Sequence, residues 1–310
     1  MKIAFIFPGQ GSQAVGMMDA WADHAEVQAI LQQGNLALGE DLAGLIAQGP
    51  ADALNLTANT QPAMLLCSVA MYRAWRQAGG PVPALVAGHS LGEYSALVAA
   101  DALGLEDAVR TVRVRAQAMQ SAVPVGQGGM AAILGLDDDT VRQVCAQASG
   151  DLIVEAVNYN APAQVVIAGH AAAVEKACEL AKAAGAKRAL PLPVSAPFHS
   201  RLLRPAAQAL AEALAAVPVR APAVPLINNV DVAMPADPAA IRDALVRQAW
   251  HPVRWVETIQ SMKRQGVTHL VECGPGKVLS GLAKRIDRDL VTCNITDPAS
   301  LQQTLDTLGA

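Results

Sequence analysis

A serine within the pattern G-x-S-x-G is the residue whose setting most directly indicates chemistry. The stretch reads GHSLG over residues 88–92, after an apolar run and before a helical pattern. In such an elbow the serine occupies a sharp strand-to-helix turn, where glycines leave room and the hydroxyl is exposed. The N–H of Leu91 would then point to the position of an oxyanion. We expect Ser90 to be a nucleophile rather than a helix cap.

A serine nucleophile needs a base, and the sequence offers six histidines. His199 is the leading candidate, because it lies in a loop after the serine, as α/β-hydrolase histidines do. His89 adjoins the serine, and we expect its side chain to point away from the hydroxyl while lining the pocket. The other four are expected to be structural, loop or surface residues, His24 within a polar helical stretch: His24, His170, His251 and His269.

A hydrolase triad also needs an acid, and the candidates between Ser90 and His199 are poor. Asp101, Glu106 and Asp107 follow closely behind the elbow helix, and residues 137–139 look like a helix cap and first turn. No carboxylate stands out as the partner that orients the base. A backbone carbonyl could take that role instead.

A second loop carries G-x-G-x-x-A after a strand, over residues 9–14. A dinucleotide site is disfavoured there, because no second strand ends in Asp or Glu about 20 residues later. Gln10 is better interpreted as a polar side chain at the carboxyl end of a strand, where open α/β sheets place ligands. Its amide could complete an oxyanion hole or bond within the turn.

The composition restricts the class of protein. The chain has 310 residues, 52% hydrophobic and 16% charged, with a net charge of −4. Nucleic-acid binding is therefore disfavoured. Five scattered cysteines without C-x-x-C spacing disfavour structural zinc and disulfides. No signal-peptide core and no run of about 20 apolar residues is found, so we expect a cytoplasmic protein without membrane spans.

Periodicity predicts an α/β fold with two kinds of sheet. Strands alternating with helices in the first and last parts predict a parallel sheet covered on both faces. These strands are expected at 3–7, 83–87, 224–228 and 269–272, and the helices at about 19–48, 63–78, 92–100, 105–120, 202–217, 241–247, 255–265 and from 278.

The middle of the chain follows the order β-α-β-β-α-β, which is typical of a ferredoxin-like unit. Its strands are expected at 129–134, 152–158, 164–168 and 187–191, and its helices at 137–148 and 171–184. We therefore predict a ferredoxin-like subdomain at 126–194, inserted into a hydrolase-like α/β domain at 1–125 and 195–310.

Many stretches together resemble the bacterial malonyl-CoA:acyl carrier protein transacylases of fatty-acid synthesis. The similarity runs from end to end and includes FPGQGSQ (7–13), TQPA (60–63), GHSLGEYSALVAA (88–100), VRAQAMQ (114–120), VNYNAPAQVVIAGH (157–170), AKRALPLPVSAPFHS (186–200), INNVD (227–231) and RQAWHPVRW (247–255). The family combines a hydrolase-like domain with a ferredoxin-like insertion, which agrees with the periodicity.

The resemblance implies a role for each matching position. Ser90 is then the nucleophile and His199 its base, while Gln10 and the Leu91 N–H form the oxyanion hole. The remaining matches are Arg115 as the binder of the malonyl carboxylate, Gln248 as the residue whose main-chain carbonyl orients the histidine, Gln61, His89 and Asn160 as pocket-lining residues, and Phe198 as a bulky filter against a methyl at the α-carbon.

The arginine can be judged from its chemistry as well. Arg110, Arg113 and Arg115 lie on one predicted helix, and Arg110 is expected to face water. A buried guanidinium fork would bind a carboxylate through two parallel bonds. Malonyl supplies that carboxylate and acetyl does not, so discrimination between them should be large.

The resemblance implies an acyltransferase that moves malonyl from coenzyme A to the phosphopantetheine thiol of acyl carrier protein through a malonyl-serine. No permanent cofactor and no metal are expected, and the chain is expected to be a monomer. A serine thioesterase or esterase is the alternative, favoured by a carboxylate bonded to His199. An idle carrier-protein-binding module is disfavoured. An acidic, transient carrier protein would need a basic surface, for which the candidates are Lys187, Arg188, Arg201, Arg204, Lys277, Lys284, Arg285 and Arg288.

Overall fold

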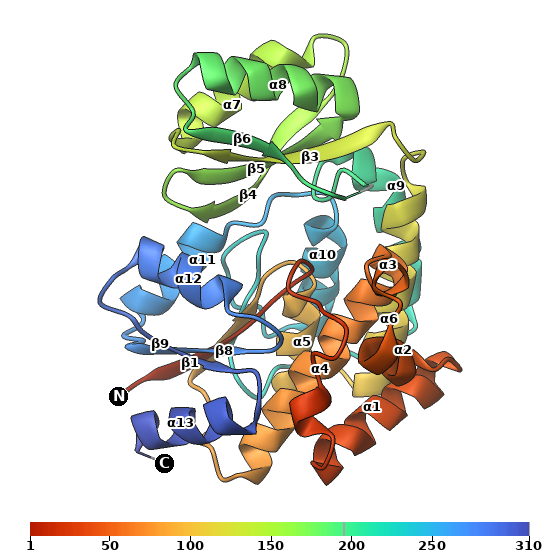
Figure 1. Ribbon diagram of the computed structural model, residues 1–310, viewed down its shortest axis with the longest axis vertical. Helices are drawn as coiled ribbons and strands as arrows, with labels where there is room; N and C mark the ends of the chain where they lie inside the picture. Colours follow the sequence, from red (N-terminus) through yellow and green to blue (C-terminus); the bar gives the residue numbers. More distant parts are fainter. Residues whose placement is uncertain (195, 310) are drawn as a thin grey trace.

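The computed structural model describes residues 1–194 and 196–309, and within these ranges five parallel strands form one sheet and four antiparallel strands a second (Figure 1). The parallel sheet has the order β7-β2-β1-β8-β9. Its strands are β1 (Ile3–Phe7), β2 (Leu85–Gly88), β7 (Leu226–Ile227), β8 (His269–Cys273) and β9 (Val291–Ile295). The α/β class predicted from the alternating pattern is confirmed.

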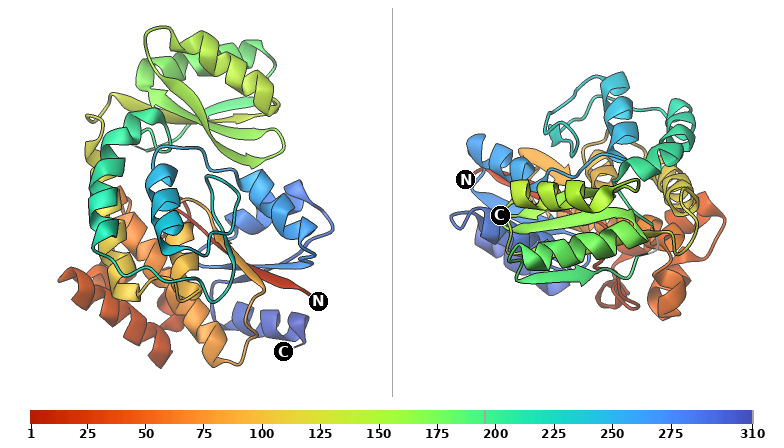
Figure 2. Two further views of the ribbon diagram at one scale, coloured as in Figure 1. Left: turned by 180° about the vertical axis from the view of Figure 1, so that it is seen from behind. Right: turned by 90° about the horizontal axis from the view of Figure 1, so that it is seen from above.

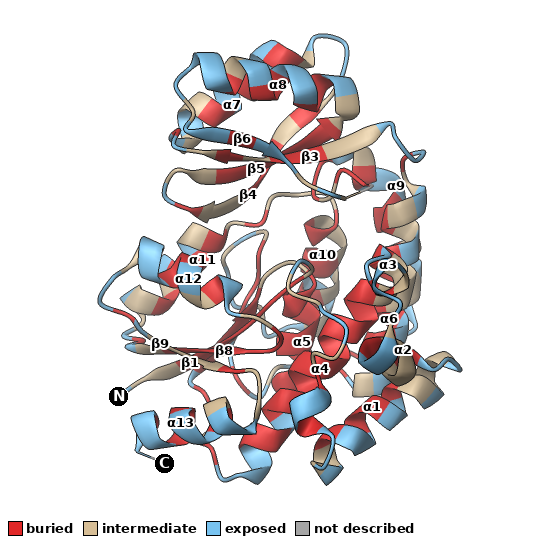
Figure 3. Ribbon diagram, in the orientation of Figure 1, coloured by how far each residue is buried: buried red, intermediate tan, exposed pale blue. Residues whose placement is uncertain are grey.

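Both faces of the parallel sheet are buried. Successive residues of a strand point to opposite faces, and on β1 both sets of residues pack into a core. Phe5 and Phe7 pack into the core that contains α4 (Thr57–Gln77) and α5 (Gly92–Ala99). Ala4 and Ile6 pack into the core on the other face, with α11 (Trp255–Arg264) and α12 (Val278–Ile286). Figure 3 shows α4 and α5 as largely buried. The helix that follows Ser90 is therefore held inside the protein rather than on its surface.

The antiparallel sheet lies at the top of the molecule in Figure 1 and has the order β4-β5-β3-β6. Its strands are β3 (Gly128–Leu134), β4 (Val154–Ala161), β5 (Gln164–His170) and β6 (Arg188–Pro191). Two helices, α7 (Asp138–Ser149) and α8 (Ala171–Ala183), cover one face (Figure 2). Met130 and Val166 lie on the opposite face, in a cluster that includes Phe198. The β-α-β-β-α-β order is confirmed, whereas the domain boundaries at 126 and 194 stay a prediction.

The remaining helices surround the parallel sheet. They are α1 (Ala25–Leu38), α2 (Leu42–Gln48), α3 (Ala51–Leu54), α6 (Leu105–Ser121), α9 (Arg204–Ala215), α10 (Pro238–Gln248) and α13 (Pro298–Leu308). The helical stretch predicted up to residue 48 is interrupted at Gly39, whose φ of 67° ends α1. The last strand and helix, β9 and α13, had not been predicted, and β9 is a half-exposed edge strand with a weak apolar pattern.

One predicted surface residue has a structural role instead. His24 is the N-cap of α1, and its Nδ1 accepts a hydrogen bond from the N–H of Val27 at 3.4 Å. It therefore lies before the helix, whereas the sequence pattern had placed it within one. Its ring satisfies a backbone donor of the first turn.

The described residues show no sign of a membrane span, a disulfide or a metal cluster. None of their helices is at once long and apolar enough to cross a membrane. Their five cysteines are free. No group of three or more His, Cys, Asp or Glu side chains among them is placed to hold a metal ion.

Candidate active site

Ser90 lies on the turn between β2 and α5, with a φ of 53°. The flanking glycines are required by close contacts of the backbone. A Cβ on Gly88 would lie 1.8 Å from the carbonyl carbon of Gly92, and a Cβ on Gly92 would lie 2.1 Å from the carbonyl oxygen of Phe7. Neither position has room for a side chain. The G-x-S-x-G spacing thus permits a turn that presents the serine at the carboxyl end of β2.

His199 contacts the serine directly. Its Nε2 lies 2.7 Å from Ser90 Oγ, and its Nδ1 lies 2.8 Å from the carbonyl oxygen of Gln248. A carbonyl only accepts, so Nδ1 carries the proton and Nε2 is left as a base toward the hydroxyl. Burial, followed by the positive charge of Arg115, lowers the pKa of His199 from 6.5 to about 3. The imidazole is therefore neutral near pH 7.

The orienting partner of His199 is a backbone carbonyl and not an acid. Both ring nitrogens are occupied, one by the Ser90 hydroxyl and one by Gln248. The carboxylates considered from the sequence have other places: Asp101 pairs with Arg73, and Asp137 caps α7. This arrangement agrees with the expectation that a carbonyl takes the place of the triad acid.

Arg115 reaches the serine from α6 and is only 2% exposed. Its Nη2 donates to Ser90 Oγ at 3.1 Å and to Gln248 Oε1 at 2.9 Å, and its Nη1 donates to Gln61 Oε1. Its Nε is buried with no hydrogen-bond partner among the described residues. All of these acceptors are neutral oxygens, so the buried cation has no carboxylate bonded to it. Burial lowers the pKa of Arg115.

The other arginines of α6 behave differently. Arg110 is exposed and pairs with Glu106 at 3.1 Å, as expected for a residue that faces water. Arg113 is 13% exposed and bonds to Glu40 at 2.8 Å. Of the three arginines on α6, only Arg115 therefore points into the site.

The serine faces a cavity of about 530 Å³ between the carboxyl ends of β1 and β2 and the antiparallel sheet. Nine of the residues proposed from the sequence line it: Gln10, Gln61, His89, Ser90, Leu91, Arg115, Asn160, Phe198 and His199. Gln248 lies behind them, in contact with Arg115 and His199. The antiparallel sheet and the loop after it add residues that had not been predicted: Met130, Asn158, Val166, Leu192 and Val194.

Gln10 lies on the turn after β1 at the edge of this cavity. Its Oε1 accepts a hydrogen bond from the hydroxyl of Thr57 at 2.8 Å. Because the oxygen is engaged, the N–H groups are the part of the amide that can serve a ligand. Leu91, which is 1% exposed, presents its backbone at the start of α5.

His89 lines the cavity and does not contact the serine hydroxyl. Its Nε2 lies 2.8 Å from Asn160 Oδ1, and its ring meets Trp255 edge-on at 5.4 Å. Burial lowers its pKa, so the ring is neutral. This contact links the loop after β2 to β4 of the antiparallel sheet and agrees with the pocket-lining role expected for both residues.

Asn229 supports the serine and was not identified from the sequence. Its Oδ1 accepts from the N–H of Ser90 at 2.7 Å, and its Nδ2 donates to the carbonyl of Gly88 at 2.7 Å. One amide therefore bonds to the backbone on both sides of His89. No local signal could have revealed this role, because Asn229 is 139 residues from Ser90.

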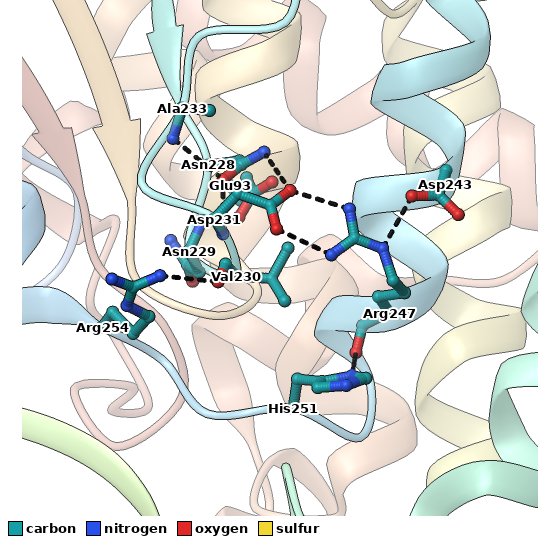
Figure 4. Close-up of polar contacts among 10 residues, drawn as sticks. All are labelled: Glu93, Asn228, Asn229, Val230, Asp231, Ala233, Asp243, Arg247, His251 and Arg254. Atoms are coloured by element: carbon teal, nitrogen blue, oxygen red, sulfur yellow. Dashed lines mark hydrogen bonds and ion pairs between the residues drawn. The ribbon is translucent and has the colours of Figure 1, made fainter.

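The loop of Asn229 is tied to the end of α10 by an ion pair (Figure 4). The guanidinium of Arg247 bonds to both oxygens of Asp231, at 2.8 and 2.7 Å, and its Nε bonds to Asp243 at 2.6 Å. The carbonyl of Arg247 accepts from His251 Nδ1 at 2.8 Å. Because Gln248 follows Arg247, these contacts connect the support of Ser90 to the support of His199.

Several candidates for a basic docking surface have partners within the protein. Arg201 pairs with Glu155 at 2.6 Å, and Arg285 donates to the carbonyl of Pro162 at 3.0 Å. The guanidinium of Arg204 lies 4.9 Å from the ring centre of Trp250. A basic surface for a carrier protein stays a prediction.

Comparison with known proteins identifies the family. The acyl transferase domain matches residues 4–289. The malonyl CoA-acyl carrier protein transacylase of Salmonella typhimurium is 53% identical, over 98% of this chain and 99% of that protein. The chain belongs to the acyl transferase domain family, and its similarity to malonyl CoA-acyl carrier protein transacylases confirms the resemblance drawn from the sequence.

Solved structures agree with this assignment. An acyl-carrier-protein S-malonyltransferase from Burkholderia pseudomallei is 66% identical and superposes with a TM-score of 0.97, covering 99% of this chain and 100% of that one. A malonyl-transacylase in complex with a type II polyketide acyl-carrier protein is 47% identical, with a TM-score of 0.98 and coverage of 99% and 100%.

Proposed function

We propose that this chain transfers malonyl groups from coenzyme A to the phosphopantetheine thiol of an acyl carrier protein, through an ester on Ser90. One observation carries the proposal: Ser90 Oγ contacts both a neutral imidazole at 2.7 Å and a buried guanidinium at 3.1 Å. The first group can remove the proton of the serine. The second can bind the free carboxylate of a short dicarboxylic acyl group.

In the first half-reaction, Ser90 gives its proton to His199 Nε2 and attacks the thioester carbonyl. The Leu91 N–H and the Gln10 amide stabilise the oxyanion. The carbon–sulfur bond then breaks, and the departing coenzyme A thiolate takes the proton from His199. Malonyl remains on the serine as an ester, and no metal or permanent cofactor is needed for this step.

In the second half-reaction, the carrier-protein thiol gives its proton to His199 and attacks the ester carbonyl. The serine oxygen leaves and regains the proton. Ester and thioester are similar in energy, so the exchange should be readily reversible. Arg115 holds the malonyl carboxylate throughout, which fixes the ester relative to the incoming thiol.

Acyl selection is assigned to two residues. Arg115 would keep a buried, unpaired charge when acetyl is bound, whereas malonyl supplies the missing anion. Phe198, next to the base, lines the same cavity and would crowd a branched acyl group. Gln61, His89, Asn160 and Gln248 shape or support the cavity.

A hydrolase is not favoured. In the thioesterase alternative a carboxylate would orient the base, yet the carbonyl of Gln248 occupies that position at 2.8 Å. The relatives are named as transacylases, and one was solved with its carrier protein. We propose an acyl carrier protein, acidic and transiently bound, as the partner of this chain. We also propose that residues 126–194 form an inserted subdomain. A monomeric state and a cytoplasmic location stay predictions of the sequence.

A partition experiment tests the transferase assignment. The protein is mixed with malonyl-CoA, freed from the excess, and then divided between buffer and a phosphopantetheine thiol, with the ester followed by mass spectrometry. We expect rapid loss of the ester to the thiol and slow loss to water. Ser90→Ala should acquire no malonyl. Loss to water as fast as loss to thiol would instead identify a thioesterase.

A further inference from the structure

The side chain of Gln248 joins three parts of the site. Its Oε1 accepts from Arg115 Nη2 at 2.9 Å, and its Nε2 donates to the carbonyl of Ser90 at 2.9 Å and to Glu93 Oε2 at 2.9 Å. An amide can be turned through 180° with almost no change of shape. In the reversed orientation its NH₂ would face the guanidinium, and its oxygen would face two acceptors. The orientation of this amide therefore decides whether Arg115 has an acceptor beside Ser90.

Glu93 is, beside the Ser90 carbonyl, one of the two acceptors that favour this orientation. It lies in the first turn of α5, one turn after Ser90, and is 1% exposed. Its Oε2 also accepts from the backbone N–H of Asn229 at 2.9 Å, in the loop drawn in Figure 4. Two donors from distant segments thus converge on one carboxylate oxygen. If the Gln248 amide were reversed, its oxygen would face this carboxylate oxygen and the bond from Gln248 would be lost, while the bond from Asn229 would remain.

We propose that Glu93 is a positioning residue for acyl selection, which turns the Gln248 amide so that its oxygen holds the Arg115 guanidinium beside Ser90. The inference rests on the proposed malonyl transfer. In the described part of the chain, the Glu93 carboxylate bonds to Asn229 and Gln248 and not to Ser90 Oγ or His199. It acts through Gln248, and through Asn229 it is also joined to the turn that carries the nucleophile.

The position of Glu93 leaves Arg115 available for a ligand. Arg115 has no ion-pair partner within 4.0 Å among the described residues, and Glu93 acts on its charge only from beyond that distance. Burial raises the pKa of Glu93 to about 7, while the bonds from Gln248 and Asn229 and the charge of Arg115 oppose the rise. Oε2 remains an acceptor in either protonation state, because a proton can reside on Oε1.

Two variants and two readouts test the proposal on the full chain. Glu93→Ala removes the acceptor, whereas Glu93→Gln keeps an amide oxygen that can accept both bonds. The first readout is the ratio of malonyl to acetyl acylation of Ser90, from kcat/KM for each thioester. The second is the rate at which phenylmethylsulfonyl fluoride modifies Ser90, since this probe needs the serine and its base but has no carboxylate.

We expect Glu93→Ala to lower the malonyl-to-acetyl ratio by about 10-fold or more, the size expected for a lost bond to a charged group. Sulfonylation should change by less than about 3-fold. Glu93→Gln should keep the ratio within about 3-fold of the parent chain. Glu93→Met, which is similar in length but lacks the acceptor, replaces the alanine variant if that variant does not fold.

Glu272 provides a matched control. It is also fully buried, and its oxygens accept from the N–H groups of Leu279 and Ser280, at the start of α12, at 3.0 and 2.7 Å. Glu272→Ala should lower the melting temperature and leave both readouts unchanged. The proposal is overturned if Glu93→Ala keeps its selectivity, if sulfonylation falls in parallel with malonylation, or if Glu93→Gln behaves like the alanine variant. Failure of the parent chain to prefer malonyl would instead overturn the proposed function.

Discussion

The guanidinium of Arg115 donates a hydrogen bond to the hydroxyl of Ser90 at 3.1 Å. The group proposed to recognise the substrate's carboxylate thus lies within bonding distance of the group proposed to attack its thioester. In malonyl these two functions are separated by a single carbon, so one short acyl group can reach both. Recognition and reaction therefore occur at adjacent atoms, and changes at Arg115 should affect which acyl group reacts.

Replacing Arg115 by Lys should reduce malonyl selection. A lysine keeps the charge but lacks the planar fork that bonds to Gln61, Gln248 and Ser90 together. We expect kcat/KM for malonyl-CoA to fall by about 100-fold, while that for acetyl-CoA changes little. Steady-state assays with both thioesters measure this effect. Arg110→Lys, on the exposed face of the same helix, is the control and should retain the parent values; equal losses for both thioesters would argue against selection by Arg115.

Replacing Gln248 by Glu should prevent the Arg115 guanidinium from binding a substrate carboxylate, although Arg115 itself is kept. The new side chain would place one oxygen where Oε1 now accepts from Arg115 Nη2 at 2.9 Å. Its second oxygen would replace Nε2 and share a proton with Glu93 Oε2, so the two carboxyl groups together would carry one negative charge and form an internal ion pair with Arg115. Malonyl would then compete with a group held within the protein, so its KM should rise by about 10-fold or more. Because the backbone carbonyl that orients His199 is kept, sulfonylation of Ser90 should persist. An unchanged malonyl KM would mean that the Gln248 side chain does not control access to Arg115.

Asn229→Ala should slow the chemistry of the serine as well as destabilise the fold. The substitution leaves the Ser90 N–H and the Gly88 carbonyl without their partner, at a cost of about 1–3 kcal/mol. Thermal unfolding and sulfonylation measure the two effects. Asn228→Ala is the matched control, because Asn228 is also buried but bonds to Asp231 within its own loop (Figure 4). If both variants lose stability and neither loses reactivity, Asn229 does not hold the nucleophile in position.

The pH dependence should reflect the buried histidine. With its pKa lowered from 6.5 to about 3, His199 stays neutral in mild acid, so sulfonylation of Ser90 should not decline as pH falls through 6.5. An acid limb centred near pH 6.5 would contradict the burial argument. The same shift affects stability. Below pH 6.5 the unfolded chain binds a proton that the folded chain does not, so the contribution of His199 to stability declines as pH falls toward 3.

The reacting residues were more predictable from the sequence than the residues that hold them in place. Ser90 was identified by its local pattern, because an elbow imposes glycines at fixed spacing. His199 was identified by its place in a loop after the serine. Arg115 could not be separated from Arg113 by helix position alone; the family resemblance selected it, and its burial distinguishes it in the structure. Glu93 lies one helical turn after the serine, in a helix whose apolar pattern favours burial, so its position could have indicated a carboxylate that supports the site.

Long-range contacts explain what the sequence did not reveal. Asn229 acts through the backbone of a turn far away in the chain, and an amide side chain has no pattern that predicts such a partner. The strand β9 has mostly half-buried residues, so its apolar signal is weak. The two-sheet architecture was predictable, since it follows from periodicity within short segments.

The central claim is that Ser90 is esterified by malonyl in preference to acetyl because of Arg115. Its most direct test is mass spectrometry of the intact protein after mixing with equal amounts of malonyl-CoA and acetyl-CoA. We predict a malonyl adduct on the parent chain that is absent from Ser90→Ala, with acetyl a minor product. No malonyl adduct, or acetyl acquired as readily as malonyl while Arg115 is present, would contradict the account.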